Sequence, residues 1–132
     1  MQFLTAYVAT AVIFFGLDFV WLSASLGLYR RHLGALLLEQ PNLLIAGVFY
    51  LLYVVGIVVL IIQPALREGS WWSVLLTGAV LGLVAYGTYD ITNLSTVKGW
   101  AWQISLIDLA WGTTVTAVAS TGGFLVTKWL AP

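Results

Sequence analysis

Four long apolar runs constrain the fold of this chain more than any other feature. They cover residues 3–23, 43–66, 71–91 and 104–130, and each reaches the length of about 20 residues that a helix needs to cross a bilayer. Lipid offers no hydrogen bonds to the backbone, so a spanning segment must satisfy its own peptide groups, as a helix does. With 61% hydrophobic and 8% charged residues, the chain has too little polar surface for a water-soluble globule. We predict an all-α integral membrane protein in which four transmembrane helices form an antiparallel bundle, as a single domain over residues 1–132.

The first run resembles a secretory signal peptide in one respect, because Ser23, Ala24 and Ser25 look like a small-residue cleavage site. A signal peptide begins with basic residues and continues with an uninterrupted apolar region. Here no basic residue precedes the run, and Asp18 and Trp21 interrupt it. We therefore expect the first run to be a retained membrane-spanning helix.

The connections between the runs predict the topology. The one at residues 67–70 is so short that the second and third helices must be antiparallel neighbours. Both chain ends then lie on the same side of the membrane as this connection. Tryptophans prefer the bilayer interface, and most of them fit this arrangement: Trp71, Trp72 and Trp129 lie toward one end, and Trp100 and Trp102 toward the other.

Charge and composition exclude several classes of function. The formal net charge is zero, so there is no basic field to hold nucleic acid. The chain has no cysteine and a single histidine, His32, which excludes disulfides, thiolate metal sites and multi-histidine metal sites. The sequence therefore predicts no metal site, no cofactor and no nucleic-acid partner.

Three aspartates lie within or at the edge of the apolar runs. A carboxylate in the bilayer centre costs about 2.5–3.5 kcal/mol on insertion scales, so it is seldom retained without a partner or a task. The topology places Asp18, Asp90 and Asp108 in the same leaflet. Carboxylates held close together in a low dielectric cannot all ionise at low cost, so we expect them to share protons. In the alternative, Lys98 or the arginines of the first connection neutralise the aspartates as ion pairs, and the cluster serves only to hold the helices together.

The basic residues bear on the first connection and on the orientation of the chain. Arg30 and Arg31 precede an apolar stretch, a pattern typical of a short amphipathic segment along the interface; simple anchoring by interfacial arginines is the alternative. Together with Lys98 they slightly outnumber Arg67 and Lys128 at the other end. The cytoplasmic side is richer in Lys and Arg, so the excess favours a cytoplasmic carboxylate end.

A D-x-x-W pattern occurs twice, at residues 18–21 and 108–111. Residues three apart share a helix face, so each carboxylate could accept an indole N–H or help to form a cation site. Because the two copies lie on antiparallel helices, we expect Trp21 to point toward the interface and Trp111 to point inward. The structural alternative is that each Asp bonds to a neighbouring helix and each Trp fills the core.

Small residues form stripes on the last two predicted helices. Gly78 and Gly82 continue at the same spacing to Tyr86 and Asp90, and a matching stripe runs from Asp108 through residues 112, 116 and 120. Small residues let helices approach closely. We predict that these two helices pack through their stripes and bring Asp90 near Asp108.

Several motifs recur together in order along the chain: D-x-x-W at residues 18–21, Y-D-x-T-N at 89–93, K-G-W at 98–100 and D-x-x-W-G at 108–112. In this combination the chain resembles a family of small bacterial inner-membrane proteins defined as a domain of unknown function, number 2177. The resemblance covers essentially the whole sequence and implies a bacterial inner-membrane protein with four helices. It implies no substrate and no reaction.

The functional hypothesis is a one-sided acidic and aromatic site that binds a small cationic group or a lipid headgroup, with proton-coupled transport as one use of such a site. The aspartates would carry charge and protons, the aromatic residues and Asn93 would form walls, and Lys98 would be the counter-ion. The predicted site residues are Asp18, Asp90, Asp108, Tyr86, Tyr89, Asn93, Trp21, Trp111 and Lys98.

Two other functions stay open. One is a lipid-modifying enzyme with a carboxylate as general base, although no nucleophile motif or nucleotide loop accompanies it. The other is a non-catalytic subunit of a larger membrane complex, in which the aspartates hold helices together. The expected partners are membrane lipid and either a homo-oligomer or a larger complex. A bundle this small would need an oligomer for a full transport path, and the glycine stripes could form the interfaces.

Overall fold

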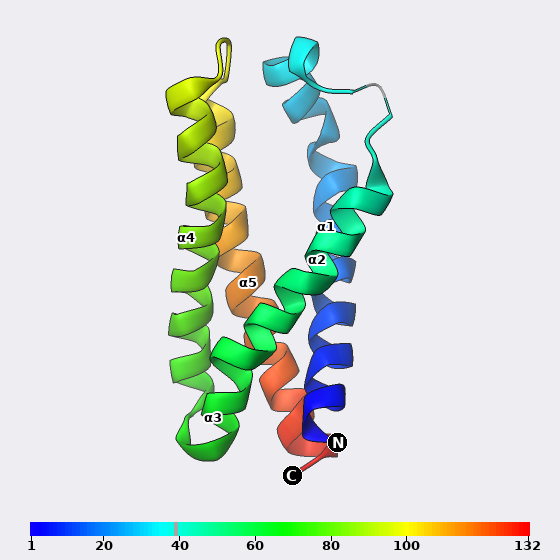
Figure 1. Cartoon of the computed structure of the whole chain (residues 1–132), viewed down its shortest axis with the longest axis vertical. Helices are drawn as coiled ribbons and strands as arrows, with labels where there is room; N and C mark the ends of the chain where they lie inside the picture. The colour runs from blue at the N-terminus through cyan, green and yellow to red at the C-terminus, as the bar shows by residue number, and fades with distance from the viewer. Residues whose placement is uncertain (39) are drawn as a thin grey trace.

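The chain folds into four membrane-length helical segments in the part that the structure, a computed structural model, describes, namely residues 1–38 and 40–132 (Figure 1). The elements are α1 (Gln2–Leu33), the 3₁₀ turn η1 (Gly34–Leu36), α2 (Leu43–Ile57), the π-helical segment η2 (Val58–Ile62), α3 (Gln63–Glu68), α4 (Trp71–Thr96) and α5 (Trp102–Leu130). The predicted all-α architecture with four spans is confirmed.

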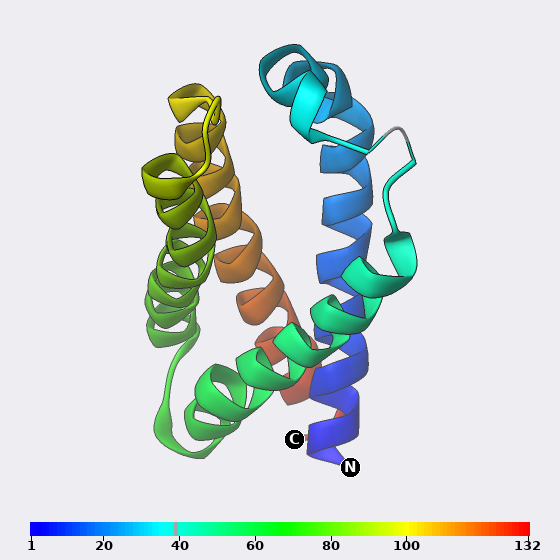
Figure 2. The ribbon, with the colours of Figure 1, turned by 45° about the horizontal axis from the view of Figure 1, so that its top comes forward.

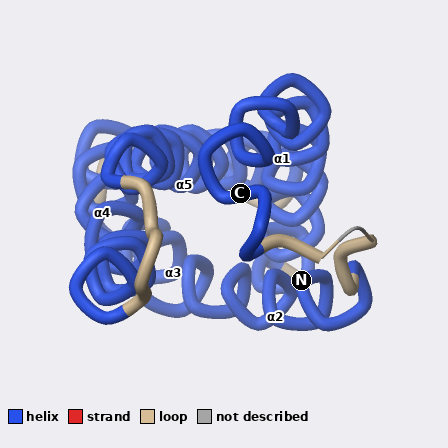
Figure 3. Tube along the Cα trace, turned by 90° about the horizontal axis from the view of Figure 1, so that it is seen from above, coloured by secondary structure: helices blue, strands red, loops and turns tan. Residues whose placement is uncertain are grey.

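Both chain ends lie at one end of the bundle, together with the turn between α3 and α4 (Figures 1 and 2). The side-chain Nε2 of Gln2 donates to the carbonyl oxygen of Ala131 at 2.8 Å, which joins the two ends. Viewed along the bundle, α1 and α5 lie side by side, opposite α2 (Figure 3). The predicted antiparallel topology is therefore the observed one.

The outer surface of the bundle is apolar, and several polar side chains are buried inside it beside an apolar core. Large hydrophobic side chains are exposed on every long helix; Leu44, for example, is 76% exposed. Thr10, Ser105, Thr116 and Ser120 are instead fully or almost fully buried. The large apolar side chains exposed on every long helix are not typical of a water-soluble protein, and they agree with lipid as the surrounding solvent.

The closest helix contact joins α4 to α5 through the predicted small-residue stripes. A Cβ on Gly82 would overlap the carbonyl oxygen of Gly112, and a Cβ on Gly112 would overlap the ring of Tyr86. A Cβ on Gly78 would lie 3.0 Å from the Cα of Ala117. The stripes are therefore used within the chain, and the suggestion that they form the interfaces of an oligomer was wrong.

The first helix continues past its predicted end at residue 23, through the basic residues that we assigned to a connection. No proline interrupts it, and the Ser25 hydroxyl donates to the carbonyl oxygen of Trp21 within the helix. Leu33 is buried, so the extension packs against the bundle. Arg30 and Arg31 thus lie in the last turn of a long helix, where cations are favoured by the helix dipole.

The second span is one helical path with a wide turn in it. The N–H of Gln63 donates to the carbonyl oxygen of Val58, five residues back, as in a π-helix. Pro64 follows directly and has no N–H to donate, so the widened turn accommodates it. The widened turn η2 contacts α1, α4 and α5, whereas most residues in the first turns of α2 are exposed.

Gly82→Ala should destabilise the bundle by about 1–3 kcal/mol, because the new methyl group must displace the backbone of Gly112. The matched control is Gly16→Ala, where nothing lies within 4 Å of the new Cβ and helix propensity alone favours alanine by about 0.5–1 kcal/mol. Equilibrium unfolding in detergent micelles measures both. Equal stability of the two variants would contradict close packing of α4 on α5.

Candidate functional site

Asp18 is held between α1 and α5. It is 5% exposed, and the indole Nε1 of Trp111 donates to its Oδ1 at 3.2 Å. Trp21 stacks on Trp111 with ring centroids 4.6 Å apart and an interplanar angle of 6°. The expectation that these two tryptophans point in different directions was therefore wrong. Because α5 runs antiparallel to α1, Trp111 lies at the depth of Asp18 and Trp21, and the two D-x-x-W motifs meet there.

Asp108 bonds to a different residue of α1. The hydroxyl of Tyr29 donates to its Oδ1 at 3.0 Å, and Asp108 is half-buried. Because the first helix was expected to end at residue 23, Tyr29 fell in the connection after it and was not among the predicted site residues. Its position four residues after Ser25 and eleven after Asp18, on one helix face, was the signal that could have identified it.

Asp90 differs from the other two carboxylates because neither of its oxygens has a hydrogen-bond partner in the described part of the chain. Its side chain is 0% exposed, and the carboxyl group of Asp108 is close enough to interact with it. Its backbone is held firmly: the Ser105 hydroxyl donates to the Asp90 carbonyl oxygen at 2.9 Å, and Trp100 Nε1 donates to Ser105 at 3.0 Å. A buried carboxylate without a partner is costly, so it needs a proton or a bound cation.

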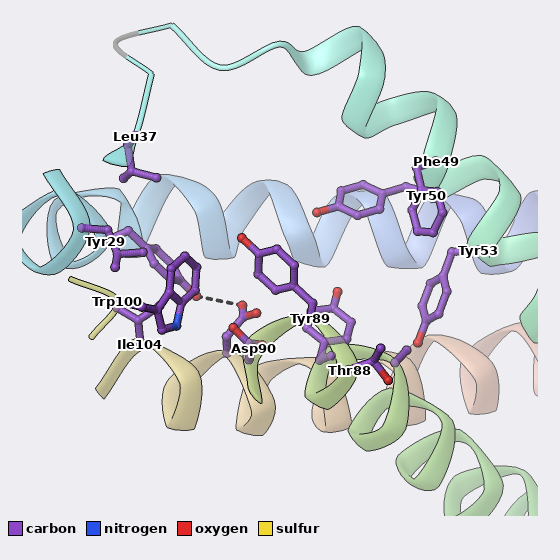
Figure 4. A pocket seen from close by; sticks show the side chains of 14 residues that line it. Tyr29, Leu37, Phe49, Tyr50, Tyr53, Thr88, Tyr89, Asp90, Trp100 and Ile104 are labelled. Atoms are coloured by element: carbon purple, nitrogen blue, oxygen red, sulfur yellow. Dashed lines mark hydrogen bonds between the residues drawn. The ribbon is translucent and has the colours of Figure 1, made fainter. Parts of the chain in front are cut away.

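Asp90 and Asp108 both line a cavity of about 580 Å³ at the carboxylate end of the bundle. Figure 4 shows that the side chains of Tyr50 on α2 and Tyr89 on α4 point into the space between these helices. The aromatic residues in the wall come from α1, α2, α4 and the loop before α5; they are Tyr29, Phe49, Tyr50, Tyr53, Tyr86, Tyr89 and Trp100. No lysine or arginine lines the cavity in the described residues.

The predicted site residues divide into three groups. Asp90, Asp108, Tyr86 and Tyr89 line the cavity. Asp18, Trp21 and Trp111 form the contact between α1 and α5 and do not line it.

The third group, Asn93 and Lys98, lies toward the membrane interface. Asn93 is half-buried one turn beyond Tyr89, and Lys98 is exposed in the turn between α4 and α5. In the described structure, Lys98 makes no ion pair with any of the three aspartates, and no three acidic or histidine side chains meet closely enough to hold a metal ion. The role of Lys98 as a counter-ion stays a prediction.

The sequence did not reveal the aromatic residues of α2. Tyr50 and Tyr53 lie in the most hydrophobic of the four runs, where apolar residues on all sides hide which face is internal. Tyr53 shares a hydrogen bond of 2.9 Å with the hydroxyl of Thr116 on α5. A search for hydroxyl-bearing aromatics in that run would have pointed to both tyrosines.

Comparison with known proteins identifies the family. A family profile described as "Predicted membrane protein (DUF2177)" matches residues 3–125, which include most of all four spans. The match confirms the family predicted from the ordered motifs. No curated protein and no solved structure matches the chain.

A double-mutant cycle on Asp18 and Trp111 should show a coupling free energy of about 0.5–2 kcal/mol, the range measured for hydrogen bonds between membrane helices. Trp111→Phe removes the N–H donor and keeps an aromatic ring against Trp21, and Asp18→Ala removes the acceptor oxygen. Unfolding free energies in micelles give the coupling. If the changes in unfolding free energy of the two single variants add to within about 0.3 kcal/mol, the hydrogen bond does not stabilise the contact of α1 with α5. Trp102→Phe, at an exposed site, is the control.

Proposed function

We propose a cation-binding function for this chain, which belongs to the DUF2177 family of predicted membrane proteins. The ligand is a small cationic group, free or on a lipid headgroup, bound in the cavity between α2 and α4. Asp90 and Asp108 supply the negative charge, and Tyr86, Tyr89 and the other aromatic residues supply the walls.

The observation that carries the proposal is the state of Asp90. Both carboxylate oxygens are buried without a hydrogen-bond partner in the described residues, and the side chain is in the wall of the cavity. A structural aspartate in a membrane protein pairs with a neighbouring helix, as Asp18 does with Trp111. An ammonium group next to Asp90 would supply the missing counter-charge, in place of a proton shared with the neighbouring Asp108 carboxyl.

The walls suit the same ligand. Aromatic rings attract cations through their negative faces by about 0.5–2 kcal/mol, more where water is excluded. The cavity has seven aromatic side chains and no basic residue in its described lining, so a cation meets attraction and no repulsion. Anions would meet two carboxylates.

Binding is expected to exchange a cation for a proton. Asp90 and Asp108 interact with one another, and two neighbouring carboxylates cannot both be charged at low cost without a counter-charge. A proton would occupy the pair when the cation leaves. This exchange is the basis on which proton-coupled transport would operate.

Transport would require a further opening of the bundle. Toward the other end, the interior is filled by buried apolar side chains, including Phe14, Ile62, Val115 and Phe124. A ligand in the cavity would have to pass this packed region to cross the membrane. We therefore place binding before transport in the proposal.

One observation favours a structural role for part of the predicted site. Asp18, Trp21 and Trp111 join α1 to α5 outside the cavity, so we assign them to support of the bundle. Lys98 and Asn93 are proposed to act at the interfacial end of the bundle, outside the cavity lining, where Lys98 balances the charge of the site. We further propose that the protein works in the bacterial inner membrane, surrounded by lipid, as a homo-oligomer or within a larger complex.

Tetramethylammonium should bind to the wild-type protein in lipid nanodiscs, and Asp90→Asn should weaken that binding by about tenfold or more, equivalent to about 1.4 kcal/mol. The substitution removes the charge and nearly preserves the shape. Isothermal calorimetry measures the affinity. Asp18→Asn is the matched control and should change affinity by less than about twofold, although it should lower stability. Equal loss in both variants, or no binding by the wild type, would refute the proposal.

A further inference from the structure

The cavity opens sideways, between α2 and α4. Two residues of its wall are largely exposed: Phe49 on α2 is 59% exposed, and Tyr89 on α4 is 57% exposed. Thr88, also in the wall, is exposed as well. A wall residue that is exposed lies at an opening, so these three residues define the lateral opening of the cavity.

The arrangement of α2 explains this opening. The helix crosses the bundle obliquely (Figures 1 and 2), and its continuation η2 contacts α1, α4 and α5. Only Val54 and Ile57 of α2 are buried, both near its lower end. The upper half of α2 therefore leaves the space beside α4 uncovered.

The lateral opening lies at the depth of lipid. At a rise of about 1.5 Å per residue, Thr88 is about 12 Å from the end of α4 at Thr96. Phe49 is about 9 Å from the start of α2 at Leu43. Both helices are apolar enough to span a membrane, and a bilayer that they cross would place lipid against this opening.

The chemistry of the cavity changes from its opening to its inner wall. Phe49 of α2 and Ala85 of α4 form an apolar part of the wall, whereas Asp90 of α4 and Asp108 of α5 provide the charge. A molecule that fits both parts has a charged head and an apolar tail. A small hydrophilic cation would use only the inner part.

We propose that the ligand is a cationic amphiphile, with a quaternary or protonated ammonium head at Asp90 and Asp108 and a hydrocarbon tail that leaves through the lateral opening. It enters from the bilayer and not from water. The inference rests on the proposed function and narrows its ligand class. A phosphate in the headgroup would lie near two carboxylates with no lysine or arginine in the described lining, so phospholipids with an ammonium group are disfavoured.

Two cations measured in phosphatidylcholine nanodiscs distinguish the two parts of the cavity. They are dodecyltrimethylammonium, with affinity expressed per mole fraction in the bilayer, and tetramethylammonium, with affinity expressed per concentration in water. Thr88→Trp fills the lateral opening. It should weaken the binding of dodecyltrimethylammonium by about tenfold and the binding of tetramethylammonium by less than about twofold. Thr114→Trp is the control, because Thr114 is an exposed threonine of α5 outside the cavity wall. It should change neither affinity.

The headgroup is tested with dodecylphosphocholine, which has the same chain and the same quaternary ammonium but adds a phosphate. Wild type should bind it about tenfold more weakly than dodecyltrimethylammonium. Equal affinity for these two ligands, or a Thr88→Trp effect that is absent or equal for the long and short cations, would overturn the inference. Binding of tetramethylammonium would then leave the proposed function intact, whereas binding of none of the three would overturn both.

Discussion

The close contact of α4 with α5 positions the rest of the site. Gly82 and Gly112 leave no room for a Cβ between the two backbones, and Tyr86 packs against Gly112 one turn nearer to the carboxylate end. At the next turn, Asp90 and Ser105 meet through a hydrogen bond to the Asp90 backbone. The register set by two glycines thus fixes Asp90 beside Asp108 and turns Tyr86 into the cavity wall.

Lipid as a solvent explains why the three carboxylates have different surroundings. A polar group in the bilayer has no water to bond, so its partner must come from the protein or from a ligand. Trp111 satisfies one oxygen of Asp18, and Tyr29 satisfies one oxygen of Asp108. Asp90 receives neither kind of bond. The first two interactions join α1 to α5 and stabilise the bundle, whereas Asp90 needs a proton or a bound cation in the cavity.

Much of the architecture was predictable because lipid imposes simple rules on length and polarity. The four runs gave four spans, and spacings of four along α4 placed Gly82, Tyr86 and Asp90 on the face that contacts α5. The side-by-side position of Trp21 and Trp111 was not predictable from depth alone, because it depends on how α1 and α5 are rotated against each other. Tyr50 was missed for a related reason: in a helix apolar on all sides, hydrophobicity does not distinguish the face toward lipid from the face toward the bundle.

The central claim is that Asp90 and Asp108 respond to a bound cation while Asp18 does not. Infrared difference spectroscopy of the carboxyl stretches in lipid, recorded before and after addition of tetramethylammonium, tests this claim most directly. Spectra of the three Asp→Asn variants assign each band. We predict that the difference bands disappear in Asp90→Asn, change in Asp108→Asn and persist in Asp18→Asn. Difference bands that disappear only in Asp18→Asn, or an unchanged spectrum in the wild type, would contradict it.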